Sequence, residues 1–369
     1  MTDRRRFLEA LVATGACAVI PGAGCVSRPA LAAVEEMIRA EIATGRVSCV
    51  ACGSPDGATY AIGDRRPGLG ASVPVDADSL FEIASVSKTF TALVAALLRH
   101  EGKLDVDVPF TRYLPDHVLA KEGTSITIRD LASHVSGFTN AWMGRAGIYG
   151  GRSWPYADDA AYERAVLAVR PAFARGEKPA YSCHALILLG FILERVGGLD
   201  LDALARKYVW DPLGMKSTTW KNVEESPRTV RMWTNGWRPL GTKGDENARG
   251  AKRPLGNAGV FSSLNDLLRY ADDLANRRVF PKDCYELLFT PVCERGRTRR
   301  SFGWDMGPGT NPPGWSAAAT NHSGYTGQYI AVDPTTRRAS VVLTNLSAAD
   351  PKARSANFEF RRSLADALG

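Results

Sequence analysis

The spacing of apolar residues near the start of the chain predicts one helix and a strand hairpin. Residues 46–53 and 58–64 are short apolar runs around the turn sequence Ser54-Pro55-Asp56-Gly57, which is typical of a hairpin. Residues 33–44 before them have helical periodicity, and Gly45 marks the end of that helix. The chain is therefore expected to open its folded part with a helix and two antiparallel strands.

A third apolar run, residues 80–84, leads directly into a helical pattern over residues 86–101. Large apolar residues recur in this pattern at helical spacing, at Phe90, Leu93, Val94 and Leu97. Alanines occupy much of the remaining surface, and Gly102 supplies the end of the helix. Since the helix is apolar nearly all round, we expect it to be buried.

The central part of the chain, residues 103–254, predicts helices joined by long loops. Thr127-Ile128-Arg129-Asp130 has the form of a capping box that opens one helix. Another helix is marked by Leu186, Leu189, Leu193 and Val196. Residues 138–156 are rich in glycine and aromatic side chains and are candidates to line a pocket.

Strand patterns return near the end of the chain. Residues 321–333 and 338–345 predict a hairpin around Pro334-Thr335-Thr336-Arg337, and residues 352–368 predict a last helix. We therefore expect an α/β (α+β) fold, in which an antiparallel sheet built from both chain ends is flanked by helices and a mostly helical region is inserted.

This arrangement implies a division of the chain into two parts after an N-terminal signal. Residues 33–104 and 255–369 are expected to form the α/β domain, and residues 105–254 the mainly helical region. A functional site is expected where the two meet, because ligands often bind at such junctions.

The first 32 residues have the layout of an export signal. Arg4-Arg5-Arg6-Phe7-Leu8 resembles the twin-arginine pattern of bacteria and precedes a mild apolar run over residues 10–24. That run is shorter than the ~20 residues of a spanning helix, so no stable membrane span is expected. Two ways of processing the signal stay open, cleavage after Ala30-Leu31-Ala32 or lipid attachment at Cys25. We expect an exported, periplasmic protein.

Composition and charge exclude several classes of protein. The chain is 45% hydrophobic and 23% charged, as in ordinary globular proteins, and its net charge is +7. One basic cluster, Arg295-Gly296-Arg297-Thr298-Arg299-Arg300, either meets an anionic polymer or lipid surface or forms a solvated loop. Basic and aromatic residues do not interleave at nucleic-acid spacing, so no nucleic-acid partner is expected.

The cysteines and histidines predict neither a metal site nor a cofactor. Cys49 and Cys52 lie three apart in a predicted strand and so face opposite sides, which favours small buried side chains over a redox or metal pair. Whether Cys284 and Cys293 form a disulfide stays open. The five histidines show no metal-binding spacing with acidic residues or cysteines, and no phosphate-binding glycine loop follows a strand.

The sharpest chemical pattern is Ser85-Val86-Ser87-Lys88 at a predicted junction of strand and helix. One helical turn separates Ser85 from Lys88, so both side chains can lie on one face within hydrogen-bonding reach. A buried lysine whose pKa is lowered by desolvation can take the proton of a serine nucleophile. The alternative is an N-cap serine with a solvent-facing lysine, but so apolar a helix leaves Lys88 little solvent face.

The sequence from residue 80 to residue 92 resembles the nucleophile segment of the class C β-lactamases and their esterase and D-amino-acid peptidase relatives. Further similar segments follow in order at residues 101–105, 113–115, 126–131, 134–137, 211–215, 259–262 and 303–304. The resemblance covers most of residues 33–345 and implies the fold of β-lactamases and penicillin-binding proteins, with Ser85 as nucleophile.

The resemblance also assigns a second motif, usually Tyr-x-Asn, to Tyr181-Ser182-Cys183. It implies that Tyr181 moves a proton between Ser85 and the leaving group. From the residues alone, a tyrosine that anchors the start of the next helix is an equally good reading. Cys183 replaces the usual asparagine in substrate binding, and because a thiol forms only weak hydrogen bonds this counts against efficient β-lactam turnover.

The third motif, Lys-Thr-Gly in many β-lactamases, is matched by His322-Ser323-Gly324. The resemblance implies that this strand lies beside Ser85 and that the backbone N–H groups of Ser85 and Tyr325 form an oxyanion hole. His322 can donate to a substrate oxygen but holds a positive charge less firmly near neutral pH. The other histidines, His100, His117, His134 and His184, are expected to be packed or surface residues, with His134 stabilising a loop.

The sequence therefore predicts a serine hydrolase that forms an acyl-enzyme on ester or amide carbonyls of a small-molecule or peptidoglycan-like substrate. A carboxylesterase is favoured over a D-amino-acid peptidase or D,D-carboxypeptidase, and a β-lactamase comes third because of Cys183 and His322. A rival of another class is a non-catalytic periplasmic domain that binds cell-wall ligands. Such a domain would not need Ser85, Lys88 and Tyr181 together. No oligomeric state follows from the sequence.

Overall fold

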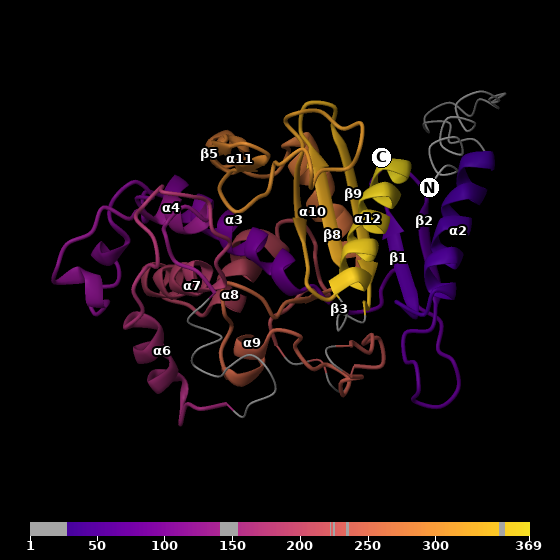
Figure 1. The fold of residues 1–369 in the computed structure, drawn as a ribbon, viewed down its shortest axis with the longest axis horizontal. Helices are drawn as coiled ribbons and strands as arrows, with labels where there is room; N and C mark the ends of the chain where they lie inside the picture. The colour runs from indigo at the N-terminus through magenta and orange to yellow at the C-terminus, as the bar shows by residue number, and fades with distance from the viewer. Residues whose placement is uncertain (1–27, 141–153, 222, 224–225, 234–235, 347–350) are drawn as a thin grey trace.

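A five-stranded antiparallel sheet contains strands from both ends of the chain. The computed structural model describes residues 28–140, 154–221, 223, 226–233, 236–346 and 351–369. The strand order is β2-β1-β9-β8-β7 (Figure 1). These strands are β1 (Cys49–Gly53), β2 (Thr59–Gly63), β7 (Thr320–Ser323), β8 (Gln328–Asp333) and β9 (Arg338–Thr344). Since β1 pairs with β9, the predicted sheet of both chain ends is confirmed.

Helices cover both faces of this sheet. The terminal helices α2 (Arg28–Ala43) and α12 (Pro351–Leu368) pack together against one face, and α10 (Leu264–Asn276) packs against the other (Figure 1). Cys49 and Cys52 belong to different apolar clusters, one on each side of β1, and both are buried free thiols. The interpretation of this pair as small buried side chains is confirmed.

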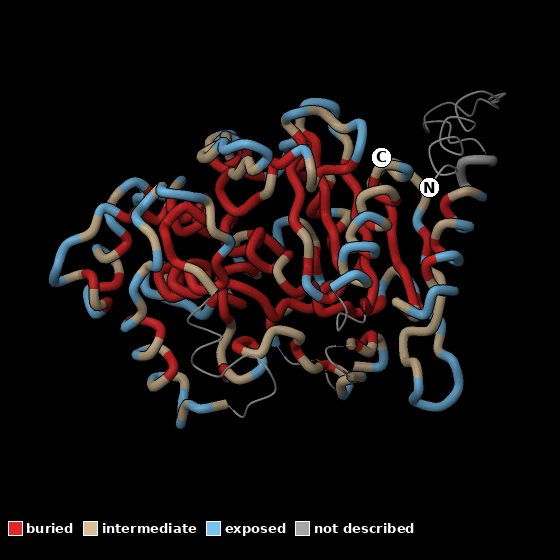
Figure 2. The backbone as a smooth tube through the Cα atoms, in the orientation of Figure 1, coloured by how far each residue is buried: buried red, intermediate tan, exposed pale blue. Residues whose placement is uncertain are grey.

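The helix that follows Ser85 is buried along most of its length. In α3 (Ser87–His100) every residue from Ser87 to Leu98 is buried, and the helix packs against α7 (Cys183–Gly197) and α11 (Lys282–Phe289). Figure 2 shows this buried interior. The predicted buried helix is confirmed, and its apolar contacts fix the first turn, where Ser85 and Lys88 lie.

The remaining elements are short. They are β3 (Phe81–Glu82), β4 (Phe261–Ser262), β5 (Cys293–Arg295), β6 (Thr298–Arg300), α4 (Ile128–Ala132), α6 (Asp159–Leu167), α8 (Leu201–Ala205), α9 (Glu246–Gly250), η1 (Ala84–Val86), η2 (Phe110–Arg112), η3 (Val118–Ala120) and η4 (Arg206–Trp210). α4 opens with the predicted capping box of Thr127 and Asp130. The division of the chain at residues 104/105 and 254/255 stays a prediction.

Three predicted elements differ from the structure. The strand predicted over residues 321–333 is two strands, β7 and β8, because residues 324–327 turn back and pair them antiparallel. The strand predicted over residues 80–84 is only the two-residue β3, which pairs with β4 outside the main sheet. The first helix begins at Arg28, before the predicted cleavage position.

Cys284 and Cys293 are both free thiols, so no disulfide joins them. Residues 1–27, with Cys25 and the arginine run, lie outside the described residues, as does most of the glycine- and aromatic-rich stretch over residues 138–156. Among the helices that the structure describes, none has both the length and the apolar character needed to span a bilayer.

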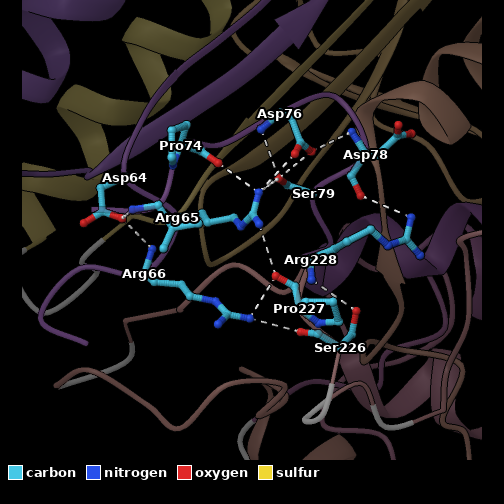
Figure 3. Close-up of polar contacts among 11 residues, drawn as sticks. Asp64, Arg65, Arg66, Pro74, Asp76, Asp78, Ser79, Ser226, Pro227 and Arg228 are labelled. Atoms are coloured by element: carbon cyan, nitrogen blue, oxygen red, sulfur yellow. Dashed lines mark hydrogen bonds and ion pairs between the residues drawn. The ribbon is translucent and has the colours of Figure 1, made fainter. Parts of the chain in front are cut away.

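An arginine network fixes the segment that leads to Ser85 (Figure 3). Arg65 and Arg66 both donate to the backbone carbonyl oxygen of Pro227, at 3.2 and 2.8 Å. The carbonyl oxygen of the next residue, Arg228, accepts the N–H of Leu80 at 2.9 Å. Because Leu80 directly precedes β3, these bonds hold the strand that leads into the turn with Ser85.

Candidate active site

Ser85 lies in a strained turn between β3 and α3. Ala84, the residue before it, has φ of +46° although it is not glycine, and such backbone costs energy that the surroundings must supply. The backbone N–H of Ala84 donates to the carboxyl of Glu82 at 3.1 Å. Ser85 itself stands in the first turn of η1, where a backbone N–H has no helical acceptor and is available to a ligand.

Lys88 is fully buried and points back at Ser85. Its Nζ donates to Ser85 Oγ at 2.9 Å, to the backbone carbonyl oxygen of Asn257 at 2.7 Å and to Cys183 Sγ at 3.5 Å. An ammonium group has three N–H donors, so these three contacts satisfy it. Nζ also lies 4.9 Å from the ring centre of Tyr181. The structure therefore brings Ser85, Lys88 and Tyr181 together.

The pKa of Lys88 differs from the sequence-based expectation. Desolvation lowers this pKa, but the interactions of Lys88 with Cys183 and Tyr181 raise it, and the balance lies above the ordinary lysine value. The expectation of a lowered pKa is therefore wrong, because it took account of burial alone. Lys88 is a cation in the resting protein at neutral pH.

Tyr181 is held at the entrance of the site by its neighbours. Its ring packs against His134, with 4.6 Å between ring centres, and the Nδ1 atom of His134 accepts the N–H of Ser182 at 3.2 Å. Burial holds the pKa of His134 well below its usual range, so the ring is neutral and can accept this bond. Tyr181 is 37% exposed, and its hydroxyl interacts with Lys88 and Ser85.

The pKa of the Tyr181 phenol is raised. Desolvation raises it, and the positive charge of Lys88 only partly opposes this effect. At neutral pH Tyr181 is thus a phenol beside the Lys88 ammonium. His134 was expected to stabilise a loop, and the loop that it supports is the one that carries Tyr181.

Cys183 begins α7 directly behind Tyr181. Its thiol lies against Lys88, and its backbone N–H donates to the Oδ1 atom of Asn140 at 2.7 Å. The side chain is buried. Since the thiol is occupied with Lys88, it is poorly placed to act as the amide donor that the usual asparagine provides.

β7 forms the opposite wall of the site. His322 is buried, its Nδ1 lies 3.1 Å from the carbonyl oxygen of Ser323, and its Nε2 has no partner among the described residues. Desolvation, together with the charges of Lys88 and Arg300, lowers the pKa of His322 to about 3. His322 is therefore neutral, and the positive charge that many relatives have at this motif is absent from it.

Gly324 and Tyr325 follow His322 in the turn between β7 and β8. A Cβ atom at Gly324 would lie 2.9 Å from the backbone carbonyl oxygen of Ile83, so only glycine lets this turn approach the turn that carries Ser85 so closely. The Tyr325 side chain is 48% exposed. The predicted substrate-binding residues thus meet around Ser85, with Cys183 behind Lys88.

Glu82 is a buried carboxyl group that sequence reasoning missed. One oxygen accepts the Ala84 N–H, and the other accepts the Oγ1 hydroxyl of Thr326 at 3.1 Å. Glu82 therefore joins the turn that carries Ser85 to the turn that carries Tyr325. Burial raises the pKa of Glu82 to about 7. The sequence signal was an acidic residue at an apolar strand position three residues before the serine.

Replacing Glu82 by glutamine is expected to lower kcat about tenfold. The amide has one acceptor oxygen, so residue 82 can no longer accept from both Ala84 and Thr326, and the link between the two turns weakens, although the Thr326 hydroxyl keeps Gln328 Oε1 as an acceptor. The measurement is steady-state ester hydrolysis, with circular dichroism to verify folding. Glu36→Gln, on the exposed side of α2, is the control. An unchanged kcat in Glu82→Gln would show that this carboxyl does not align the site.

The site opens into a cavity of about 320 Å³. The cavity is lined by Ser85 and Tyr181 and by residues of β7 and the segments beside it. The lining residues are Ser85, Tyr181, Arg300, Asp305, Thr310, Asn321, His322, Ser323, Gly324 and Tyr325. Most of these side chains are polar. The cavity is large enough for a small ester or amide and surrounds the position that an attacked carbonyl would take.

One cluster of metal-ligand residue types lies elsewhere among the described residues, at His100, Asp283 and Cys284. Asp283 already pairs with Arg99 and His100, at 3.0 and 2.8 Å. Burial raises the pKa of the Cys284 thiol to about 12, so it stays protonated. This chemistry favours an ion-pair cluster over a metal site.

Comparison with known proteins places the chain in a family. Residues 34–362 match the family model described as Beta-lactamase. The chain belongs to the Beta-lactamase family. The resemblance drawn from the three motifs is thereby confirmed at the level of the family, whose members include the serine hydrolases named next.

Two curated relatives in the Beta-lactamase family have different activities in their names. The chain is 29% identical over 264 residues to Esterase EstB of Burkholderia gladioli, covering 63% of this chain and 67% of the esterase. It is 26% identical over 247 residues to the D-alanyl-D-alanine-carboxypeptidase/endopeptidase AmpH of Escherichia coli K12, covering 66% of this chain and 61% of that protein.

Solved structures agree on the fold. The structure of EstCE1, described as a hydrolase with promiscuous acyltransferase activity, superposes with a TM-score of 0.76 at 20% identity. The superposition covers 92% of this chain and 98% of the EstCE1 chain. At this identity the likeness establishes the β-lactamase fold of the chain and leaves its substrate to the site residues.

Proposed function

We propose that this protein is a carboxylesterase of the Beta-lactamase family that acts through an acyl-enzyme on Ser85. The observation that carries the proposal is the 2.9 Å hydrogen bond from the buried Nζ of Lys88 to Ser85 Oγ, with the Tyr181 hydroxyl beside both. A hydroxyl, an amine and a phenol in one enclosed site supply the proton transfers that acyl transfer requires.

In the proposed mechanism, Ser85 Oγ attacks the ester carbonyl and loses its proton to the Lys88–Tyr181 pair. The oxyanion that forms accepts hydrogen bonds from the backbone N–H groups of Ser85 and Tyr325. The pair returns the proton to the leaving alcohol. Water then attacks the acyl-enzyme by the same route and releases the acid.

The protonation of the resting site predicts a pH dependence. The pKa values of Lys88 and Tyr181 are both raised, so both groups keep their protons to higher pH than usual. The pair can accept the Ser85 proton only after it has lost one, and the fraction in that state grows with pH. We expect kcat/KM for a neutral ester to rise from about pH 6 to about pH 9.

Tyr181→Phe tests the origin of this pH profile. The hydrogen bond and the charge interaction with the Tyr181 hydroxyl are among the causes that raise the pKa of Lys88, so removal of this hydroxyl should lower that pKa. The residual activity of Tyr181→Phe is therefore expected to begin its rise at lower pH than that of the wild type. The measurement is a pH–rate profile corrected for spontaneous hydrolysis. A profile that is flat or falls with pH would contradict the proposed proton path.

Two features favour esters over amides and β-lactams. The thiol of Cys183 contacts Lys88 and offers no amide to a substrate, and His322 is neutral where many β-lactamases have a lysine. Expulsion of an amine from an amide or lactam needs stronger proton donation than expulsion of an alcohol. A D-amino-acid peptidase, the activity type in the name of AmpH, is the second candidate.

A substrate panel tests the activity. Purified protein is assayed with p-nitrophenyl acyl esters, D-alanyl peptides and a chromogenic cephalosporin. The proposal expects fast ester hydrolysis, slow peptide hydrolysis and the slowest turnover of the cephalosporin. Peptide or lactam turnover that exceeds ester turnover would replace the esterase assignment, and no turnover of any compound would favour a ligand-binding domain.

We also propose that residues 1–32 direct export to the periplasm. The support is the run Arg4-Arg5-Arg6-Phe7-Leu8 before a short apolar stretch. N-terminal sequencing of protein recovered from a periplasmic fraction distinguishes cleavage after Ala32 from lipid attachment at Cys25. Recovery of the uncut chain in the cytoplasm alone would refute the export proposal.

A further inference from the structure

Arg361 on α12 is a buried cation that the proposed mechanism does not use. Only 4% of its surface is exposed, and burial lowers its pKa to about 10, so the guanidinium stays charged at neutral pH. Among the residues that the structure describes, none forms an ion pair with it, and Glu41, the acid that acts on its pKa, already pairs with Arg46 at 3.1 Å. Since burying an unpaired cation costs free energy, its hydrogen bonds must offset this cost.

The guanidinium holds both ends of the turn that carries Tyr325. The helix α12 packs against β8 (Figure 1), and Nη1 of Arg361 donates to the backbone carbonyl oxygen of Gln328 at 2.5 Å and to that of Gly324 at 3.5 Å. The carbonyl oxygen of Gln328 also accepts the N–H of Gly324 at 2.7 Å. Nε of Arg361 donates to the carbonyl oxygen of Asn357, one helical turn earlier, at 3.3 Å. The side chain therefore ties the turn to the C-terminal helix.

The Gly324 carbonyl and the Tyr325 N–H belong to one peptide group. This peptide bond is trans, as are the other peptide bonds that the structure describes, so its C=O and N–H point in opposite directions. Arg361 contacts the oxygen and thus lies on the far side of the peptide from the N–H, which has no acceptor among the described residues. A cation beside the carbonyl oxygen polarises the peptide group and makes its N–H a stronger donor.

We propose that Arg361 is a positioning residue for the reaction at Ser85, which orients the Tyr325 N–H and strengthens the hydrogen bond from this group to the oxyanion. This inference rests on the proposed hydrolysis. Negative charge develops on the attacked carbonyl oxygen only as Ser85 Oγ bonds to the carbonyl carbon, so the effect is larger in the transition state than in the bound ester. Loss of the Arg361 charge should therefore slow acylation more than it weakens substrate binding.

Two variants that differ in charge test this role. Arg361→Gln and Arg361→Lys both shorten the side chain and keep an N–H donor, but only lysine keeps the positive charge. Arg361→Gln is expected to lower kcat/KM for p-nitrophenyl acetate about tenfold or more, whereas Arg361→Lys should stay within about threefold of the wild type. The measurement is steady-state hydrolysis, with a thermal melt to verify folding.

Arg362→Gln is the control for the loss of an arginine from α12. Arg362 follows Arg361 directly, but it donates to the backbone carbonyl oxygen of Asn311 at 3.0 Å and pairs with Glu359 at 2.8 Å. Within the described part of the chain, it makes no hydrogen bond to the turn between β7 and β8. Its replacement should leave kcat/KM unchanged.

The carbonyl band of the acyl-enzyme reports the hydrogen bond to the oxyanion position itself. p-Nitrophenyl pivalate, isotopically labelled at the carbonyl carbon, loads Ser85 with an acyl group that water removes slowly, and infrared difference spectra record its carbonyl stretch. Stronger hydrogen bonds to this oxygen weaken the C=O bond and lower the frequency of the band. We expect the lowest frequency in the wild type, an intermediate one in Arg361→Lys and the highest in Arg361→Gln. A side chain that served only the stability of the fold would leave the band of the folded acyl-enzyme in place.

The outcomes separate this role from the esterase proposal. Equal kcat/KM and equal band positions in Arg361→Gln and Arg361→Lys would overturn the role of Arg361 and leave the esterase proposal standing. Should Arg361→Gln not fold, Arg361→Lys decides, because a loss of about tenfold or more in that folded variant would overturn the role. Should neither variant fold, Arg361 serves the stability of the fold and the role falls. No ester turnover by the wild type, together with no labelling of Ser85 by a fluorophosphonate, would overturn both proposals.

Discussion

Replacing Ser85 by alanine is expected to lower ester turnover by a factor on the order of 10⁴ or more, because the proposed mechanism needs the Ser85 hydroxyl to form the acyl-enzyme. Lys88 and Tyr181 would remain without a hydroxyl to deprotonate. The measurement is the steady-state hydrolysis of a p-nitrophenyl ester, beside labelling with a fluorophosphonate, and both should disappear.

Ser87→Ala is the matched control for this variant. Ser87 lies two residues away and is buried where Ser85 is partly exposed, and its hydroxyl donates to the carbonyl oxygen of Ala84 and accepts the N–H of Val260. Its loss should cost about 1–3 kcal/mol of stability and leave the reaction in place. Turnover that persists in Ser85→Ala and is lost in Ser87→Ala would place the nucleophile elsewhere.

The second large effect is expected for Lys88→Ala, which should lower kcat by a factor on the order of 10² or more. The variant removes the group that donates to Ser85 and the charge that opposes the rise in the pKa of Tyr181. Lys88→Arg should not restore the rate, because a guanidinium does not give up its proton in this pH range.

The measurement for these variants is kcat for a neutral ester together with a thermal melt. Lys103→Ala is the control, since Lys103 is exposed and pairs with Glu101 at the surface. The melt separates lost chemistry from lost folding, because removal of a fully buried side chain also leaves a cavity. Near-normal kcat in Lys88→Ala would assign the base to another group.

The parts of the fold that the sequence predicted well are those set by local pattern. The buried helix α3 follows from four apolar residues at helical spacing with alanines between them, and all of them are buried. The hairpin of β1 and β2 follows from apolar runs around a short turn sequence. In these elements each residue's neighbours in the sequence decide its conformation.

The strand pattern over residues 321–333 was misleading because nearly every residue there is buried. Thr320, Asn321, His322 and the whole of β8 are buried, and the turn between the two strands spans only residues 324–327. The turn forms because Gly324 allows close approach to Ile83 and Gly327 adopts a positive φ of +103°. These requirements come from tertiary packing, which a local pattern does not record.

The sequence predicted which residues meet in the site, but it did not predict their pKa values. Ser85 and Lys88 lie one helical turn apart, so their contact follows from helix geometry. The pKa of Lys88 depends on Cys183 and Tyr181, which come from a distant segment. Glu82 was missed for the same reason, since its role depends on Thr326 in the turn between β7 and β8, which only the folded chain brings close.

The central claim, a covalent intermediate on Ser85, is tested most directly by peptide mapping with mass spectrometry after reaction with a fluorophosphonate. The account predicts one adduct, located on Ser85 and absent when the wild type is first saturated with a slowly hydrolysed ester. An adduct on another residue, or an unmodified Ser85 in protein that still hydrolyses esters, would contradict it.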